Sequence, residues 1–132
     1  MNERTTMTTW SVLLMILFSV SCSALAQILL KYGMAQPATQ QALSSGDIWL
    51  ITRLIGTDLS ILGGFFLYGF GAVIWLFVLA KLDVSVAYPF VAIGLILTMV
   101  LGCLVFGEVL TLRKIMGTLI VAIGIYLVAT NP

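Results

Sequence analysis

Histidine is absent from the sequence, and charged residues make up only 8 % of it. A soluble domain usually carries about 25 % charged residues, so this chain lacks the polar surface that a water-soluble globule needs. Basic and acidic residues nearly balance, and the net charge of +1 provides no basic surface for nucleic acid. The shortage of charge indicates a protein whose main solvent is lipid, and we expect no nucleic-acid partner.

The groups that carry most enzyme chemistry are also scarce. Without histidine, and with only five scattered carboxylates, the chain lacks the parts of a catalytic triad or a transition-metal site. We therefore expect no enzyme activity, no cofactor and no metal. Cys22 and Cys103 both stand inside apolar runs, which favours two small packed side chains over a disulfide.

Long apolar runs dominate what is present, since 61 % of the residues are hydrophobic. A helix of about 20 apolar residues crosses the hydrocarbon core of a bilayer. The runs predict an all-α membrane protein with spans at about 10–31, 59–80, 84–106 and 114–129. Because the connections are mostly short, we expect one domain over residues 1–132, built as an antiparallel four-helix bundle in the cell (inner) membrane.

The connection between the first two spans is the longest. Pro37, Gly46 and the glutamines and serines between them predict that its first half is irregular. Asp47 then precedes a short apolar segment, which predicts a capped helix at about 47–56. This helix is too short to span, so we expect it at the membrane interface.

Two features of the first span and the loops leave alternatives open. Ser23-Ala-Leu-Ala26 before Gln27 resembles a signal-peptide cleavage site, but the apolar run continues to Leu30, which favours a retained helix. The basic residues show only a weak bias, which would place the first and third loops in the cytoplasm. Insertion in either orientation is the alternative.

A line of polar residues runs along the first span. Ser19, Ser23, Gln27 and Lys31 recur at every fourth position, so they share one face of the helix. Polar side chains inside a membrane face other helices or a cavity. The line therefore indicates either hydrogen bonds between helices or one wall of a substrate path, with Lys31 placed to attract an anionic head group.

The third span contains the one proline within a predicted span. Pro89 removes a backbone donor, so we expect a bend there, with Gly94 as a second hinge position and Tyr88 in the substrate path. In the fourth span, Gly117 and Gly124 are seven residues apart on one face, which predicts a packing stripe either inside the bundle or, as we favour, between two chains. No acidic residue lies deep in a span, because Asp58, Asp83 and Glu108 fall at span ends.

Several motifs then resemble a known group, the EamA-type unit of the drug/metabolite transporter superfamily. They are Gln27-Ile-Leu-Leu-Lys31, Ser85-Val-Ala-Tyr-Pro-Phe-Val-Ala-Ile-Gly94, Phe106-Gly-Glu108, Arg113-Lys-Ile-Met-Gly117 and Ile123-Gly124. The resemblance covers almost the whole chain and is weakest over 34–58. It implies a half-size transporter.

Two branches of this superfamily have four helices. Small multidrug resistance proteins carry an essential glutamate and a tryptophan where this chain has Ser23 and Val91, which argues against proton-coupled drug export. The chain is more similar to the paired subunits that flip undecaprenyl-phosphate-linked aminoarabinose. That resemblance implies membrane lipids and a lipid-linked or amphipathic substrate as partners, alternating access, and a homodimer or heterodimer with a similar subunit. A small-metabolite or cation exporter and an accessory subunit of a membrane enzyme stay open as alternatives.

Overall fold

The computed structural model describes residues 3–130, with side chains described from Trp10 to Val128 and at Thr130. This part of the chain contains seven helices and no strand, so the all-α prediction is confirmed for it. The helices are α1 (Glu3–Met34), α2 (Pro37–Ser45), α3 (Ile48–Thr57), α4 (Leu59–Leu79), α5 (Val84–Ala87), α6 (Pro89–Phe106) and α7 (Leu112–Ala129).

Within the described residues, three helical segments are long and apolar enough to cross a membrane. These are Trp10–Met34, Leu59–Leu79 and Val84–Phe106, close to the first three predicted spans. They make the chain a multi-pass membrane protein. The helix α1 begins at Glu3, before the predicted span, and α7 is not among the three segments, so a fourth span stays a prediction.

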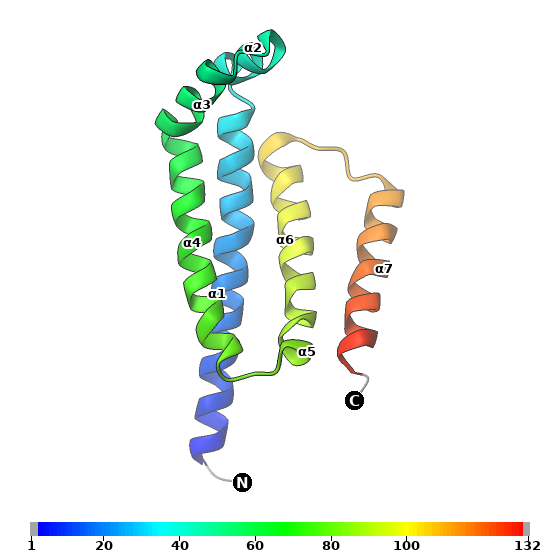
Figure 1. The fold of residues 1–132 in the computed structure, drawn as a ribbon. Coiled ribbons are helices and arrows are strands. Elements are labelled where there is room, and N and C mark those ends of the chain that lie inside the picture. Colours follow the sequence, from blue (N-terminus) through cyan, green and yellow to red (C-terminus); the bar gives the residue numbers. More distant parts are fainter. Residues whose placement is uncertain (1–2, 131–132) are drawn as a thin grey trace.

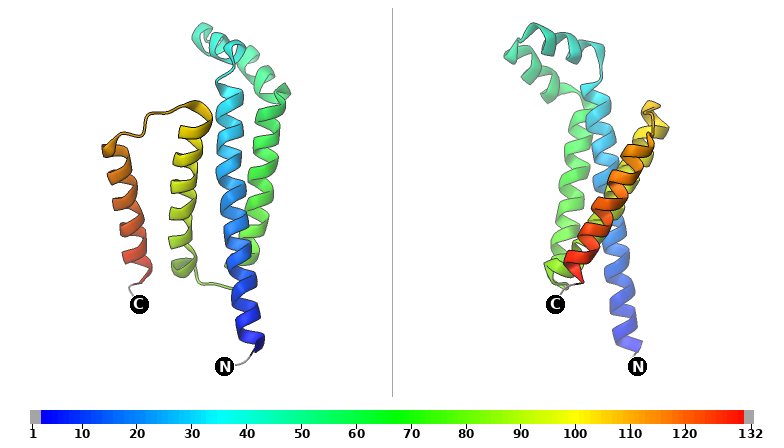
Figure 2. Two further views of the ribbon diagram at one scale, coloured as in Figure 1. Left: turned by 180° about the vertical axis from the view of Figure 1, so that it is seen from behind. Right: turned by 90° about the vertical axis from the view of Figure 1, so that its right-hand side faces the viewer.

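The long helices stand side by side in the order α4, α1, α6, α7 (Figures 1 and 2). The main contacts of α1 are with α4 and α6, whereas α7 packs on α6 and touches α5. A four-helix bundle needs two neighbours for every helix, and α7 has one long neighbour only. The chain therefore forms an open row in place of the predicted bundle, although consecutive long helices (α1, α4, α6 and α7) are antiparallel.

Glycines bring α1 and α4 unusually close together. A Cβ added to Gly71 would lie 3.1 Å from the Cβ of Cys22, and one added to Gly64 would lie 3.2 Å from the carbonyl oxygen of Ala26. Small residues permit this approach, and close packing replaces the hydrophobic drive that lipid does not provide. Both cysteines are free, as predicted.

The prediction of an irregular segment after α1 is wrong, because Pro37–Ser45 forms the helix α2. Pro37 occupies the first turn, where its missing N–H costs nothing. Gly46 ends the helix in the left-handed conformation, with φ of 70°. The predicted helix after Asp47 is confirmed as α3, and the Asp47 carboxylate accepts a hydrogen bond from the Leu50 N–H at 3.1 Å.

The third span is interrupted at Tyr88, between α5 and α6 (Figure 1). Pro89 has no N–H to donate to the preceding turn, and the Val91 N–H donates to the Tyr88 carbonyl at 3.0 Å. The interruption lies one turn from the start of the span. Gly94 lies inside α6, where an added Cβ would be 3.0 Å from Val20 on α1.

Candidate functional site

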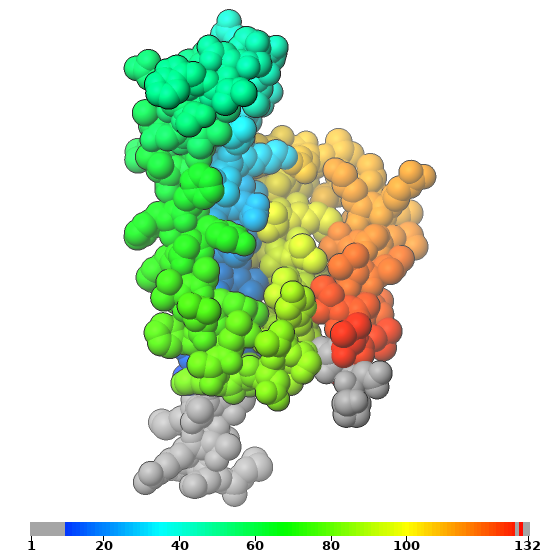
Figure 3. Space-filling model, viewed as in Figure 1, coloured from blue at the N-terminus to red at the C-terminus, as the bar shows by residue number. Residues whose placement is uncertain are grey.

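A large cavity occupies the space that the open row leaves beside α1. Its volume is about 1120 Å³, and residues of α1, α4, α6, α7 and the α6–α7 loop line it. Figure 3 shows α7 standing apart from α4, with parts of α6 and α1 visible between them. The polar and charged lining residues are Ser19, Ser23, Gln27, Lys31, Tyr68, Thr98, Glu108, Arg113, Lys114 and Thr118.

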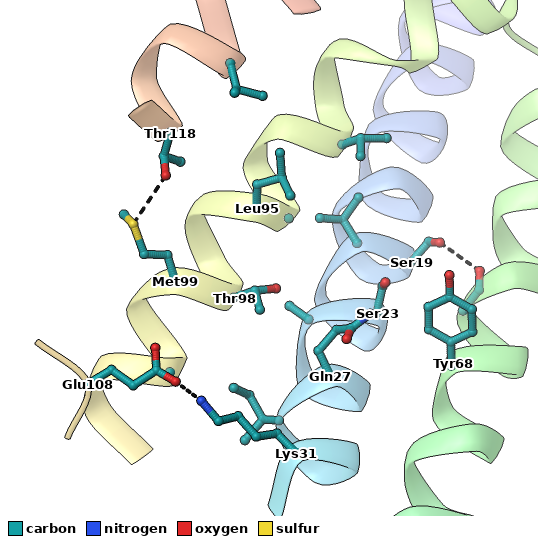
Figure 4. A pocket seen from close by; sticks show the side chains of 18 of the residues that line it. Ser19, Ser23, Gln27, Lys31, Tyr68, Leu95, Thr98, Met99, Glu108 and Thr118 are labelled. Carbon is teal, nitrogen blue, oxygen red and sulfur yellow. Dashed lines mark hydrogen bonds and ion pairs between the residues drawn. The ribbon is translucent and has the colours of Figure 1, made fainter. Parts of the chain in front are cut away.

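The polar line predicted on α1 forms one wall of this cavity. All four of its residues line the cavity, because steps of four residues keep them on the helix face between α4 and α6. Figure 4 shows Gln27 on α1 and Thr98 on α6 facing the same space. The spacing therefore located a continuous polar strip, in a cavity whose lining is otherwise mostly apolar.

The first member of the line has a structural hydrogen bond. The hydroxyl of Ser19 is buried and donates to the carbonyl oxygen of Gly71 on α4 at 2.7 Å. The missing side chain of Gly71 allows this contact between the helices. The groups of the line that remain available to a ligand are thus Ser23, Gln27 and Lys31, which follow Ser19 toward the C-terminal end of α1.

An ion pair lies at the Lys31 end of the strip. The Lys31 ammonium pairs with the carboxylate of Glu108 (Figure 4). The Lys31 Nζ also lies 4.8 Å from the centroid of the Phe106 ring. The side chains of Lys31 and Glu108 keep 50 % and 35 % of their surface exposed, so the pair is accessible from the cavity. A cation over an aromatic face gains further electrostatic stabilisation.

Local backbone chemistry turns Glu108 back toward the cavity. Gly107 ends α6 with φ of 64°, a left-handed conformation that other residues rarely adopt, and donates its N–H to the Cys103 carbonyl. An added Cβ on Gly102 would lie 3.5 Å from the Glu108 carboxylate. The two glycines therefore reverse the chain and leave room for a loop carboxylate beside Lys31.

The start of α7 adds two more cations to the lining. Arg113 and Lys114 follow Thr111, whose hydroxyl caps α7 by accepting the Lys114 N–H at 3.3 Å. With Lys31 they give three cationic side chains against the single carboxylate of Glu108 among the lining residues. This end of the cavity can therefore attract an anion, and it does so next to a carboxylate that can attract a cation.

Two of the predicted site residues, Tyr88 and Gly124, lie away from the polar line on α1. Tyr88 and Gly124 line a second, more apolar groove of about 630 Å³ between α5 and α7, while Gly117 lines the main cavity. A Cβ on Gly117 or Gly124 would meet nothing within 4 Å, so neither glycine packs against the rest of the described chain. The structure thus separates Tyr88 from the polar line on α1.

The sequence analysis did not predict that Tyr68 lines the cavity, and it placed Glu108 only at the end of a span. Tyr68 follows Gly64 by one helical turn on α4, and its place in the lining depends on how α4 packs. The Gly107–Glu108 step carried a signal, because a glycine that ends a helix reverses the chain. Among the described residues, no group of three histidine, cysteine or acidic side chains is placed to hold a metal ion.

Comparison with known proteins finds relatives of similar length. A protein from Serratia proteamaculans, named as a probable 4-amino-4-deoxy-L-arabinose-phosphoundecaprenol flippase subunit ArnF, is 31 % identical over 83 % of this chain and 85 % of its own length. The ArnE protein of Hamiltonella defensa, named in the same way, is 34 % identical over 87 % of this chain and 90 % of its own length. The ArnE protein of Pseudomonas syringae is 30 % identical over 79 % of this chain and 87 % of its own length. No family model and no solved structure matches the chain.

Proposed function

Because the chain belongs to the family of 4-amino-4-deoxy-L-arabinose-phosphoundecaprenol flippase subunits, we propose that it translocates a sugar linked to undecaprenyl phosphate. As a member of that family it is a membrane flippase subunit, hence a transporter and not an enzyme. In the proposal it works in the bacterial inner membrane, in a dimer, by alternating access.

The observation that carries the proposal is a cavity with one polar wall inside an apolar protein. Ser23, Gln27 and Lys31 offer hydroxyl, amide and ammonium groups along one strip, which suits the hydroxyls and phosphate of a sugar head group. Outside the strip, α1, α4 and α7 expose large hydrophobic side chains, which suit lipid chains. An amphipathic substrate matches both surfaces.

The open row supports a dimer. Gly117 and Gly124 lie on α7 with no neighbour within 4 Å of an added Cβ, so another helix could approach closely there. A second subunit of similar architecture would supply the neighbour that α7 lacks and would close the cavity. Copurification of the tagged chain from its native membrane tests whether that subunit is identical or different.

In the proposed cycle, the segment around Pro89 is the hinge. The α5–α6 interruption leaves a short helix that can tilt independently, and Tyr88 next to it would enter the path as α5 moves. Gly94, packed against Val20, would be the second position to change its contact. Broken helices near a binding site are the recurring device of membrane transporters.

Flipping in cells tests the function. In a strain lacking this chain, we expect the lipid-linked amino sugar to be protected from a membrane-impermeant amine reagent, and the intact chain to restore labelling at the outer face. Lys31→Ala and Gln27→Ala should restore labelling at least about tenfold less well, because each removes a polar partner of the head group. Full restoration by both variants would contradict the assignment of the polar strip.

A further inference from the structure

The Lys31–Glu108 pair combines two properties that an ordinary structural ion pair does not need. It lies in the lining of the large cavity, and both side chains are partly exposed to it. An exposed ion pair contributes little to stability, so its partners exchange readily for others. The left-handed Gly107, which ends α6, reverses the chain just before Glu108, and Glu108 lies over Gly102, 3.5 Å from where a Cβ would stand.

We propose that this pair is a recognition site for a zwitterionic head group, in which Glu108 binds an ammonium and Lys31 binds a phosphate. The inference rests on the proposed function and goes beyond it by naming the group that selects the amine. In the empty state Lys31 and Glu108 neutralise each other. When the substrate enters, the phosphate replaces Glu108 on Lys31 and the substrate ammonium replaces Lys31 on Glu108.

Charge balance favours such an exchange. One internal ion pair is replaced by two pairs with the ligand, so neither Lys31 nor Glu108 loses its partner when the substrate binds. Arg113 and Lys114 line the same cavity and add to the attraction for the phosphate. The phosphate and the ammonium are recognised by neighbouring side chains, so the two charges of the ligand must belong to one head group.

The same geometry discriminates against anions that lack an amine. A phosphate on Lys31 displaces Glu108 but leaves its carboxylate close by, and two like charges repel each other. A ligand that brings its own cation removes this penalty. Glu108 is therefore a specificity-determining residue, which rejects the wrong lipid as well as binding the right one.

Binding of lipids to the purified complex tests the inference. The full chain, with any subunit that copurifies from its native membrane, is placed in lipid nanodiscs. Undecaprenyl phosphate carrying an amino sugar is compared with the same lipid after N-acetylation, which removes the positive charge. We expect about tenfold tighter binding of the free amine, as for a charged hydrogen bond, and a loss of this preference in Glu108→Gln.

Three variants separate recognition from folding. Lys31→Gln should weaken binding of both lipids, because each carries the phosphate. The double exchange Lys31→Glu with Glu108→Lys restores an internal ion pair, so it should fold with the thermal stability of the original. It also transposes the two charges, so it should weaken binding of the amine lipid. Asp83→Asn, between α4 and α5 and outside the cavity lining, is the matched control and should leave binding unchanged.

The outcomes distinguish failure of the inference from failure of the proposed function. If Glu108→Gln keeps the tenfold preference, or the double exchange binds the amine lipid as tightly as the original chain, the pair is structural and the inference is wrong, while the proposed function stands. If the original chain binds neither sugar lipid, the proposed function fails and the inference fails with it. Equal competition by phosphatidylethanolamine, which carries the same two charges, would support zwitterion recognition but assign it to a phospholipid.

Discussion

The α1–α4 interface and the surface of α7 differ in how the chain uses small residues. Toward α4, Gly64 and Gly71 lie against the α1 backbone, and a Cβ added to either would be closer to α1 than an ordinary van der Waals contact. On α7, beyond α6, Gly117 lines the main cavity and Gly124 the second groove, and a Cβ added to either would meet nothing within 4 Å. The same residue type thus closes one interface and leaves the other surface free. The difference indicates a fixed pair of helices, α1 with α4, and a free half, α6 with α7, to which a helix of another subunit can add.

The largest effect is expected where the fixed pair is overpacked. Gly71→Leu would force the new side chain into Cys22 and the Ser19 carbonyl, and we expect a loss of about 3 kcal/mol of stability or failure to fold. Gly69→Leu on the same helix is the control, because nothing lies within 4 Å of its position. Thermal unfolding in detergent measures both. Equal stability of the two variants would remove the basis of the comparison.

The next effect concerns the left-handed turn that carries Glu108. Gly107→Ala places a Cβ in the left-handed region and should lower stability by roughly 1 kcal/mol. Gly56→Ala, in the helix α3 with no close neighbour, is its control and should be neutral or slightly stabilising. Calorimetry on the two variants gives the difference. A Gly107→Ala chain as stable as the Gly56→Ala chain would contradict the role of this turn.

The free half is probed through association. Gly124→Leu should leave the unfolding temperature of the single chain nearly unchanged, since no atom of the described chain opposes it. If a partner helix packs on this stripe, the same change should shift the complex toward single subunits by about tenfold in dissociation constant, the effect of about 1.4 kcal/mol. Mass measurement in detergent reads the stoichiometry. An unchanged dimer would place the partner on another face.

The spacing of residues predicted more of the molecule than the chemistry of single residues did. Apolar runs located the first three spans, because crossing lipid demands a minimum length. The four-residue spacing located the polar wall. In contrast, Pro37 and Gly46 suggested irregular chain, since the same two residues interrupt a helix in its interior and delimit it at its ends.

The role of Glu108 was out of reach for a related reason. By position it is a loop residue at the end of a span, and only the left-handed Gly107 and the space over Gly102 bring it beside Lys31. Contacts between residues that far apart in sequence depend on packing, which spacing along one helix does not contain. The position of α7 at the end of the row could not be predicted either, because its apolar run is compatible with a closed bundle as well as with a row.

The smallest expected effect lies within the polar line itself, between Ser19 and Ser23. Ser19 donates to Gly71 in the fixed interface, so Ser19→Ala should cost about 0.6 kcal/mol, the average for such hydrogen bonds between membrane helices. It should not alter the affinity for substrate. Ser23 is one turn further and lines the cavity, so Ser23→Ala should leave stability unchanged and weaken binding of the sugar lipid. Measuring stability and binding on both variants sharpens the comparison to two neighbouring hydroxyls. If both serines affected binding alone, the boundary between the fixed interface and the substrate path would lie closer to the start of α1.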